Sequence, residues 1–463
     1  MTLHETLARA VADIELASLS PGAREGLHAT IVDTVGCMFA AAAEPFADAA
    51  VRAASQACGA GNCVVVGRDE RLSPAAAAMV NATLGHGYDF DDVHMPSVAH
   101  FSTIVIPAAL AACELANASG QAFLDAVVAG DEVGGRIGWA ACSPAWGGTA
   151  VRNSGFFPTS VLGTLAAAAA AAKALSMSAH ATGQAIAIAA SYASGLACIS
   201  RGDNSTKRTQ AGWAAQAGLS AALLAREGYT GPQAVLETPQ GFFEAFTRGH
   251  YDAGAIRRPE DGPWICEEMS FKYYPLEYFI HPLVEMAARA KSDPDFSAHS
   301  IVRIEATVAS RFTTLFEPAD RKCSPRDRFE ALISAPYCIA RALTKRGPGH
   351  LFLDDFRGGY AMDETVRSLA TRVVFVPDGE VDAVFPLHVA AKLKLHFSSG
   401  RIWQDAVPDV YGSLQRPLQD GHLVEKFRRN CSALGKERSE RLRQTLSRLE
   451  RQTDASWIRR LRA

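Results

Sequence analysis

The feature of the sequence that most constrains the fold is a series of alanine- and leucine-rich segments between residues 104 and 227. Alanine has the highest helix propensity, and its small side chain lets neighbouring helices approach closely. Helices that are apolar on almost every side belong in the interior of a large helical assembly. We therefore predict five buried helices: Ile104 to Leu115, Gln121 to Val133, Thr159 to Leu175, His180 to Cys198 and Ala211 to Glu227.

Further helices are predicted before this series. Ser20-Pro21 and Ser73-Pro74 each place an N-cap residue before a proline at the first helical position. We expect the first of these helices to continue through Phe39 and the second to cover residues 75–84. The apolar positions that recur at helical spacing at the start of the chain are Leu3, Leu7, Val11 and Ile14.

The pattern changes after about residue 265. Residues 300–310 and 389–397 alternate apolar with polar side chains, which is the period of a half-buried strand. Ser399-Gly400 then turns the second of these strands into Arg401 and Ile402, which predicts a hairpin. The other elements predicted here are a strand at 373–376 and helices near 337–345 and 364–370.

These patterns predict a mainly α protein with two domains, because 463 residues exceed the size of most single cores. We assign residues 268–403 to a smaller α+β domain. The chain returns to a helical pattern after about residue 420, so the large all-helical domain is predicted to be discontinuous, with residues 1–267 and 404–463.

The charge distribution predicts that nucleic acid is not a partner. The chain has 46 Lys+Arg against 49 Asp+Glu, a net charge of −3, which gives no strong overall field for nucleic acid or a membrane. Residues 426–463 hold twelve basic and four acidic side chains and are therefore +8. A basic tail can bind anions. However, Leu442, Leu446 and Leu449 recur at helical spacing, which favours a docking helix with its arginines in solvent.

Cysteine usage and hydropathy predict a cytoplasmic protein. The ten cysteines are scattered without a Cys-x-x-Cys pair, which favours reduced thiols over a zinc site or a disulfide framework. The N-terminus lacks the basic and apolar segments of a signal peptide. The most apolar run, around Leu162 to Leu175, contains Lys173 and is too short to span a bilayer. We predict no membrane partner.

One stretch, from Gly85 to Thr103, is the densest in titratable groups. Asp89, Asp92 and His100 are candidates for proton transfer, because a carboxylate can orient a neighbouring imidazole. The alternative is that these acids and histidines only cap or support a loop. Their spacing matches no zinc-binding helix, and we predict no metal. The six groups are His86, Asp89, Asp91, Asp92, His94 and His100.

A second polar stretch covers residues 201–212. Lys207 and Arg208 lie just before a predicted helix, where free N–H groups and the helix dipole would add to their charge. A carboxylate or a phosphate would suit such a site. The glycine spacing of a P-loop is missing. The alternative is a solvated basic turn.

A third stretch, Phe271 to His281, is aromatic and stands at the junction of the two predicted domains. Aromatic residues at a junction commonly serve packing. Lys272 and Glu277 are charged residues within this run, and we count both, together with Tyr274, as candidates for contact with a substrate.

Together these stretches resemble the MmgE/PrpD family, which includes 2-methylcitrate dehydratases, cis-aconitate decarboxylases and iminodisuccinate epimerases. The resemblance covers nearly the whole chain and depends on the order and spacing of its motifs. The motifs are Asp89-Phe90-Asp91-Asp92 to His100 leading into Pro107-Ala108-Ala109-Leu110-Ala111, Thr206-Lys207-Arg208 followed by Gly212 and Ala215, Glu227-Gly228-Tyr229-Thr230-Gly231-Pro232, and Lys272-Tyr273-Tyr274-Pro275.

The resemblance implies a helical domain with a smaller α+β lid, usually in a homodimer, and no nucleotide or redox cofactor. It also implies removal of a proton next to a carboxylate of a small organic acid, with loss of water or carbon dioxide, or epimerisation. By resemblance, Asp89, His100, Lys207 and Lys272 fall on active-site positions. Cations at the two lysine positions would stabilise enolate-like charge, and His100 with Asp89 would handle protons.

Four positions depart from the family pattern. Val93 replaces a threonine of cis-aconitate decarboxylases, and Glu277 replaces one of their histidines. Phe157 and Gln210 stand where many relatives have histidine. The pocket is therefore expected to be less basic and more apolar, which favours a substrate with less negative charge than citrate-like acids. The alternatives are an ordinary 2-methylcitrate dehydratase or cis-aconitate decarboxylase, and a non-catalytic binding homologue.

Overall fold

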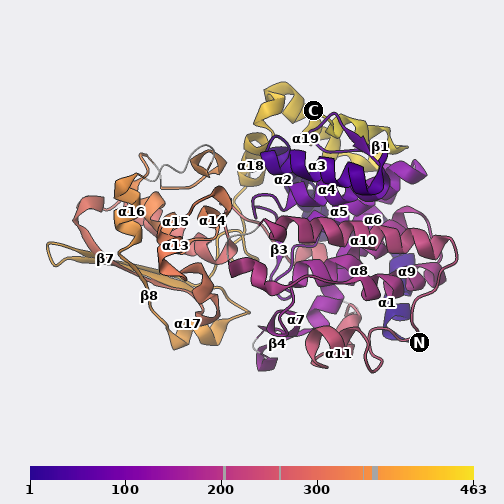
Figure 1. Ribbon diagram of the computed structural model, residues 1–463, viewed down its shortest axis with the longest axis horizontal. Helices are drawn as coiled ribbons and strands as arrows, with labels where there is room; N and C mark the ends of the chain where they lie inside the picture. Colours follow the sequence, from indigo (N-terminus) through magenta and orange to yellow (C-terminus); the bar gives the residue numbers. More distant parts are fainter. Residues whose placement is uncertain (147, 202–204, 260–261, 348, 357–362) are drawn as a thin grey trace.

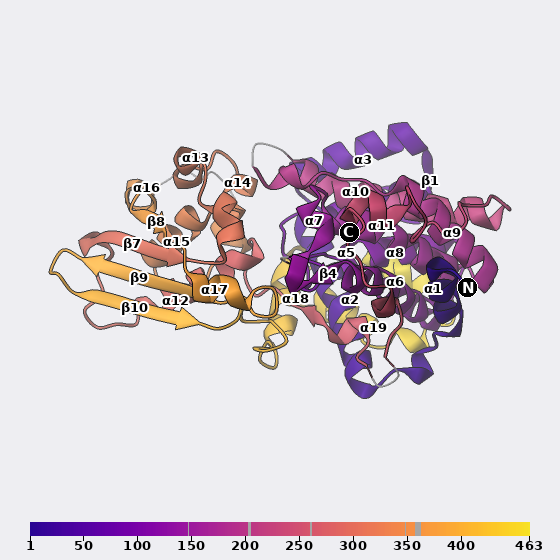
Figure 2. The same cartoon turned by 90° about the horizontal axis from the view of Figure 1, so that it is seen from below.

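In a computed structural model, the chain forms two lobes of unequal size (Figures 1 and 2). The larger lobe is helical and holds both termini, and the smaller lobe contains a four-stranded sheet. The chain is thus mainly α with a smaller α+β part, which confirms the predicted fold class. The structure describes residues 1–146, 148–201, 205–259, 262–347, 349–356 and 363–463.

The helices of the larger lobe begin where the sequence provides caps. The Ser20 side chain accepts a hydrogen bond from the N–H of Ala23, and Pro21 occupies the first helical position. The main helices of this lobe are α1 (Leu3–Asp13), α2 (Pro21–Ala41), α3 (Pro45–Cys58), α4 (Pro74–Gly85), α5 (Ser102–Ala116), α6 (Gly120–Ala140), α7 (Ala150–Asn153), α8 (Pro158–Ala174), α9 (Ala179–Tyr192), α10 (Thr206–Arg226), α11 (Phe242–Thr247), α18 (His422–Asn430) and α19 (Lys436–Leu446).

Helix α8 forms the centre of this lobe. It packs against α5, α6, α9 and α10, and nearly all of its residues are buried. Small residues allow this close approach: a Cβ at Gly218 of α10 would lie only 2.5 Å from the carbonyl oxygen of Thr164. The alanine-rich segments therefore form the predicted interior of a helical assembly.

Three of the predicted helix limits were wrong. The helix expected over 121–133 continues to Ala140. The helix expected over 180–198 ends at Tyr192, because the chain turns away at Gly195, where φ is 123° and a Cβ would lie 2.9 Å from Ser160. The helix expected from Ala211 begins at Thr206. Lys207 and Arg208 thus lie in the first turn of α10 instead of before it.

The smaller lobe is built on a sheet with the strand order β10-β9-β7-β8. In this sheet the β7–β8 pair is parallel, and the β10–β9 and β9–β7 pairs are antiparallel. Ile304 pairs with Leu395, and buried residues alternate along β9, as the sequence predicts for a half-buried strand. The strands are β7 (Ile301–Thr307), β8 (Val373–Phe375), β9 (Ala391–Phe397) and β10 (Ile402–Val407). The predicted hairpin is the β9–β10 pair.

Helices cover the sheet of the smaller lobe. Helix α12 packs against β9, β10 and α15, and the inward side chains of Leu393 and Leu395 are buried. The strand β10 continues to Val407, past the limit of 403 that we placed from the sequence. The helices of this lobe are α12 (His281–Ala290), α13 (Ala319–Cys323), α14 (Arg328–Leu332), α15 (Ala335–Thr344), α16 (Glu364–Ala370) and α17 (Gly379–Val384).

Short strands pair at three further places. The pair β3–β6 joins the loop after α4 to the segment that leads into the smaller lobe, with Val93 opposite Ser270. The strands of these pairs are β1 (Ala60–Val64), β2 (Arg71–Leu72), β3 (Val93–His94), β4 (Cys142–Ser143), β5 (Gly148–Thr149) and β6 (Met269–Ser270).

The C-terminal segment docks on the larger lobe. Leu442, Leu446 and Leu449 are buried, which confirms the predicted docking face. Within the described residues, no single helix is long and apolar enough to cross a membrane. Helices α2 and α3, bent by 96° at their junction, pass that test of length and composition only as a pair.

Candidate active site

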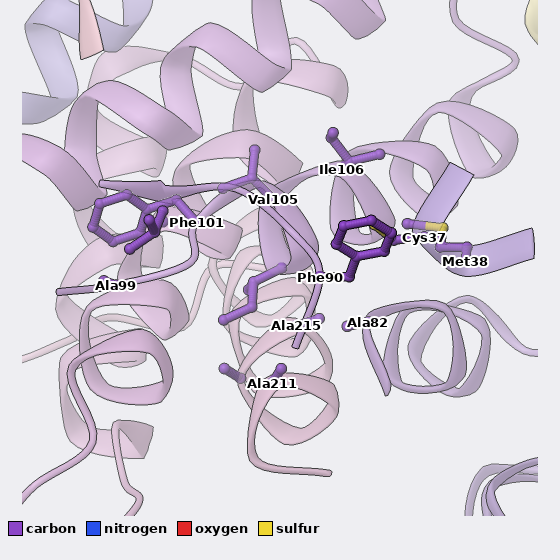
Figure 3. Packing of buried hydrophobic residues seen from close by; sticks show 14 of the residues in the cluster. Cys37, Met38, Ala82, Phe90, Ala99, Phe101, Val105, Ile106, Ala211 and Ala215 are labelled. Carbon is purple, nitrogen blue, oxygen red and sulfur yellow. The ribbon is translucent and has the colours of Figure 1, made fainter. Parts of the chain in front are cut away.

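The loop between α4 and α5 holds a buried group of acids and histidines. Asp89 adopts a φ of 52°, a left-handed conformation that residues with a Cβ rarely adopt and that tends to occur at functional sites. This conformation places the Asp89 carboxylate in the interior, where the residue is 1% exposed. Next to it, Phe90 belongs to the same buried cluster as Cys37 and Met38 of α2 (Figure 3).

Two lysines from distant segments contact the Asp89 carboxylate. Nζ of Lys207 lies 2.6 Å from Oδ2, and Nζ of Lys272 lies 2.7 Å from Oδ1. Lys272 also donates to the backbone carbonyl of Asp89 at 2.6 Å. Lys207 is positioned by the first turn of α10, and Lys272 by the strand β6, which pairs with β3 of the loop. The structure thus brings three of the candidate residues into direct contact.

This arrangement keeps Asp89 ionised. Burial alone would raise the pKa of Asp89, but Lys207 and Lys272 outweigh burial and hold that pKa well below its ordinary value. Burial would likewise lower the pKa of Lys272, but Asp89 and Asp91 raise it. Two ammonium groups face one carboxylate, so the triad can accept a further negative charge.

His100 lies beside this triad as a neutral imidazole. Its Nδ1 lies 2.6 Å from the backbone carbonyl of Asp92, which can only accept, so Nδ1 carries the proton. Its Nε2 then has a free lone pair and lies 3.8 Å from Oδ1 of Asp89. Burial, opposed by Asp91, lowers the pKa of His100 to about 3. His100 therefore presents a base toward the carboxylate and its two lysines.

His86 is a member of this cluster to which the sequence analysis gave no role. Its Nδ1 lies 2.8 Å from Oδ2 of Asp91, and its ring lies 4.8 Å from the ring of His100. Burial would raise the pKa of Asp91, but His86 and His100 hold it below its ordinary value. Asp91 can therefore orient both imidazoles. Among the described residues, His86 Nε2 has no hydrogen-bond partner.

Asp92 and His94 lie outside the triad. Asp92 accepts a hydrogen bond from the Ser102 hydroxyl at 2.6 Å. Burial and Asp33 raise the pKa of Asp92 well above its ordinary value. His94 is held between Ser97 Oγ, at 2.7 Å, and Glu268 Oε2, at 2.9 Å. Both residues have contacts suited to loop support.

Lys426 ties the C-terminal helix α18 to the loop. Its Nζ donates to the carbonyl of Phe90 at 2.6 Å and lies 2.6 Å from Oδ1 of the buried Asp33 in α2. It also lies 3.9 Å from the centre of the Phe90 ring. The sequence analysis missed this pair, because a lysine in a basic tail and an aspartate in an apolar helix give no signal that they meet.

Two of the residues that we expected to depart from the family pattern lie near the triad. Glu277 accepts a hydrogen bond from the N–H of Phe279 at 2.9 Å. Burial and Asp89 raise the pKa of Glu277, while Lys272 and Lys207 oppose the rise. The ring of Phe157 is buried, with its centre 6.2 Å from that of His86.

Two cations that the sequence analysis did not consider also face Glu277. Burial lowers the pKa of Lys322, in α13 of the smaller lobe, to about 8, and Glu277 opposes this shift. Burial also lowers the pKa of Arg152 in α7, and Glu277 opposes this shift. Glu277 therefore lies among positive charges from both lobes.

The remaining candidates make other contacts. Val93 is buried in β3. Arg208 donates to the carbonyl of Gly87 at 2.8 Å and lies 4.3 Å from the centre of the Phe46 ring. The Tyr274 hydroxyl bonds to Nδ1 of His350 at 2.8 Å. The predicted anion-binding stretch at 201–212 includes residues 202–204, which lie outside the described residues.

The cluster also has the composition of a possible cation site. One ligand atom from each of four residues can be chosen so that all lie within 4.8 Å of one another, and imidazole with carboxylate suits several divalent metals. However, Lys207 and Lys272 already neutralise one of these carboxylates and would repel a metal ion. The four residues are His86, Asp89, Asp91 and His100.

Comparison with sequence models of known protein families identifies the family of this chain. A sequence model of the MmgE/PrpD N-terminal domain matches residues 5–253, and one of the MmgE/PrpD C-terminal domain matches residues 274–451. The chain belongs to the MmgE/PrpD family. Asp89, His100 and Lys207 lie within the first match, whereas Lys272 lies in the short interval between the two. The proposed site of this MmgE/PrpD protein thus draws on the junction of the domains.

Relatives cover most of the chain at low identity. The cis-aconitate decarboxylase-like protein oryM of Aspergillus oryzae is 28% identical over 448 residues, which cover 92% of this chain and 90% of the relative. A cis-aconitate decarboxylase of Aspergillus terreus is 26% identical and covers 92% and 89%. A cis-aconitate decarboxylase of Homo sapiens is 27% identical and covers 94% and 88%.

Proposed function

We propose that this MmgE/PrpD protein is a lyase or isomerase that needs no cofactor and removes a proton next to a carboxylate of a small organic acid. The observation that carries the proposal is the buried Asp89 carboxylate, held between Lys207 and Lys272 and faced by the free Nε2 of His100. The relatives named as cis-aconitate decarboxylases support the lyase class.

In the proposed reaction, Lys207 and Lys272 hold a substrate carboxylate, because the triad with Asp89 has positive charge in excess. His100 Nε2 then takes a proton from the neighbouring carbon, or returns one to it. The two lysines stabilise the negative charge that develops on the carboxylate oxygens as the enolate-like state forms. In a dehydration, the enolate-like state would expel a hydroxyl group, which leaves as water with the proton that His100 has taken. In an epimerisation, a proton would return to the other face of the same carbon. In a decarboxylation, carbon dioxide would leave first, and His100, already protonated, would give a proton to the carbanion that remains.

We further propose that the substrate is less anionic or more apolar than citrate-like acids. The buried residues Phe157 and Val93 are apolar at positions where the family resemblance leads us to expect a histidine and a threonine. Glu277 adds a carboxyl group close to the lysines, and its raised pKa favours the neutral form. A neutral Glu277 can donate a hydrogen bond, but an ionised one would repel a second substrate carboxylate.

The second candidate is an ordinary cis-aconitate decarboxylase or 2-methylcitrate dehydratase. The near full-length matches to cis-aconitate decarboxylases favour it. In that case Asp89, His100, Lys207 and Lys272 would suffice for the chemistry, and Val93, Phe157 and Glu277 would be tolerated. We also propose, from the family resemblance, that the protein is a cytoplasmic homodimer.

The purified protein incubated with cis-aconitate, citrate, 2-methylcitrate and a series of mono- and dicarboxylic acids separates these candidates. Alkene absorbance and carbon dioxide release report turnover. Turnover of less anionic acids, with the tricarboxylates inactive, supports the main proposal, whereas efficient turnover of a tricarboxylate supports the second. Calorimetric binding of an acid without any conversion would contradict both.

A further inference from the structure

The C-terminal segment forms a groove that is separate from the Asp89 site. We call it the arginine groove. It has a volume of about 700 Å³, and none of the described residues that line it is acidic. This volume lies within the range of small-molecule sites. The five arginines that line it are Arg438, Arg441, Arg448, Arg451 and Arg460.

The arginines come from α19 and from two short helical turns that follow it in the sequence. Arg438 and Arg441 belong to α19, where the buried Leu442 also reaches the groove. Arg448 and Arg451 come from the next turn, and Arg460 from a later one. The docking of the apolar face of α19 therefore directs these guanidinium groups toward one surface depression.

Two of the guanidinium groups are held in place. Arg460 donates to the hydroxyl of Thr445 at 3.1 Å. Arg438 donates to the backbone carbonyls of Arg462 and Ala463 at 2.8 and 2.7 Å. The Thr445 hydroxyl and the Arg462 carbonyl are neutral acceptors, so they orient the two cations without neutralising them. Such positioning lowers the entropy cost of binding a ligand.

Two carboxylates of the C-terminal segment lie near the groove but do not neutralise its arginines. Glu440 pairs with Arg443 and Arg428, which do not line it. Glu437 lies 3.5 Å from Arg441, but both side chains are largely in solvent, where such a pair contributes little. In the part of the chain that the structure describes, Arg448, Arg451 and Arg460 have no carboxylate within ion-pair distance. Converging unpaired cations repel one another, and a bound anion would relieve that repulsion.

We propose that the arginine groove binds a compact polyanion with several phosphate groups. The planar guanidinium group matches phosphate with two parallel hydrogen bonds, and several arginines on one surface favour a ligand with several such groups. Of the residues described by the structure, those that line the groove include no aromatic side chain. A nucleobase would thus find no stacking partner, and the ligand would be recognised through its charge. The inference is independent of the function proposed for the Asp89 site.

Calorimetric titration with inorganic tripolyphosphate tests the proposal. The full-length protein is compared with the double variant Arg448→Gln/Arg451→Gln at an ionic strength of about 0.15 M. These two arginines are exposed and unpaired, so the fold should tolerate their loss. The matched control is Arg9→Gln/Arg52→Gln, which removes two exposed arginines from α1 and α3. ATP and orthophosphate are titrated in parallel.

We expect tripolyphosphate to bind the wild type and the control equally, and the groove variant at least about tenfold more weakly, since each arginine makes charge-assisted hydrogen bonds. Affinity should fall steeply with added salt. ATP binding as tightly as tripolyphosphate identifies the triphosphate as the recognised group, and orthophosphate should bind more weakly. Absence of tripolyphosphate binding, or equal weakening in both double variants, would overturn the proposal. A sedimentation change confined to the groove variant would instead indicate an interface between copies, and would also overturn it.

Discussion

The charged groups of the Asp89 site are buried and paired, whereas those of the arginine groove are mostly exposed and unpaired. At the Asp89 site, Lys207 and Lys272 lie within 2.7 Å of the carboxylate, and all three residues are buried. In the groove, most of the arginines are exposed and face no carboxylate among the described residues. Burial makes an unpaired charge very costly, whereas solvent screens the charges of the groove.

This difference predicts how each region responds to substitution. Removing one charge from the buried site should affect activity and folding together, because its partner stays buried without compensation. Removing a charge from the groove should leave the fold intact and change only anion binding. Variants of the buried cluster should therefore show the largest losses of activity and stability.

The largest effect is expected from His100→Ala. Loss of a general base costs roughly 10²- to 10⁴-fold in rate, so kcat should fall by about that factor. The matched control is His94→Ala, which removes a buried histidine of the same loop that contacts Ser97 and Glu268 instead of the triad. The folded control should retain most of its turnover. Equal losses of kcat in the two folded variants would remove His100 from the proposed role.

Lys272→Met should destabilise the fold strongly. It leaves Asp89 with Lys207 alone in a buried site, and breaking a buried ion pair costs about 3–5 kcal/mol. Lys392→Met is the comparison, since Lys392 pairs with Asp378 and Glu380 in solvent, and no measurable loss is expected. Urea unfolding of both variants gives the two free energies. Similar values would show that burial does not distinguish the two sites.

The Asp33–Lys426 pair allows a test by double-mutant cycle. Lys426→Met should lower the free energy of unfolding by a few kcal/mol, because Asp33 stays buried without its cation. Adding Asp33→Asn should recover part of the loss, since the neutral amide needs no counter-charge. The free energy of unfolding that the double variant still lacks, relative to the wild type, measures the hydrogen bond between Lys426 and the carbonyl of Phe90. A double variant no more stable than Lys426→Met would contradict a charge-based explanation.

The effect that is smallest at neutral pH, and that develops only on acidification, is a change in the pH dependence of stability. The pKa of His100 is lowered from 6.5 to about 3. Between these values the unfolded chain binds a proton that the folded protein does not, so His100 makes stability fall as pH falls from about 6.5. Its contribution approaches about 1.4 kcal/mol per pH unit.

Removing this group should flatten the acid side of the stability profile. In His100→Gln, the free energy of unfolding should depend less on pH between about 6.5 and 3. His180→Gln removes an exposed histidine and is the control. Asp92 and Asp131, whose pKa values are raised by burial, act in the opposite direction in both variants, whereas His281, whose pKa burial lowers to about 3, acts in the same direction in both. An unchanged slope in His100→Gln would contradict a buried neutral imidazole.

Much of the fold could be predicted, because apolar periodicity follows burial directly. The alanine-rich helices, the half-buried strand β9 and the docking leucines of the tail all appear at the expected places. The errors occur at helix ends. The polar residues from Thr206 to Gln210 can form a helical turn as readily as a loop, so the sequence alone could not locate the start of α10.

The site was predictable as a set of segments but only partly as a set of contacts. Asp89, His100, Lys207 and Lys272 meet, whereas Arg208 and Tyr274 bond to other groups. The contact between His86 and Asp91 depends on the left-handed backbone at Asp89, which residue spacing does not reveal. Lys426 reaches the loop only because α18 packs on α2.

The most direct test of the central claim is proton NMR in deuterium oxide with the series of small carboxylic acids. For at least one acid, the wild type should form product or replace a hydrogen next to a carboxylate with deuterium. His100→Ala and Lys207→Ala should do so at least about 100-fold more slowly. If no acid changes in the wild type, or if both variants keep its rate, then Asp89, His100, Lys207 and Lys272 do not form the proposed proton-transfer site.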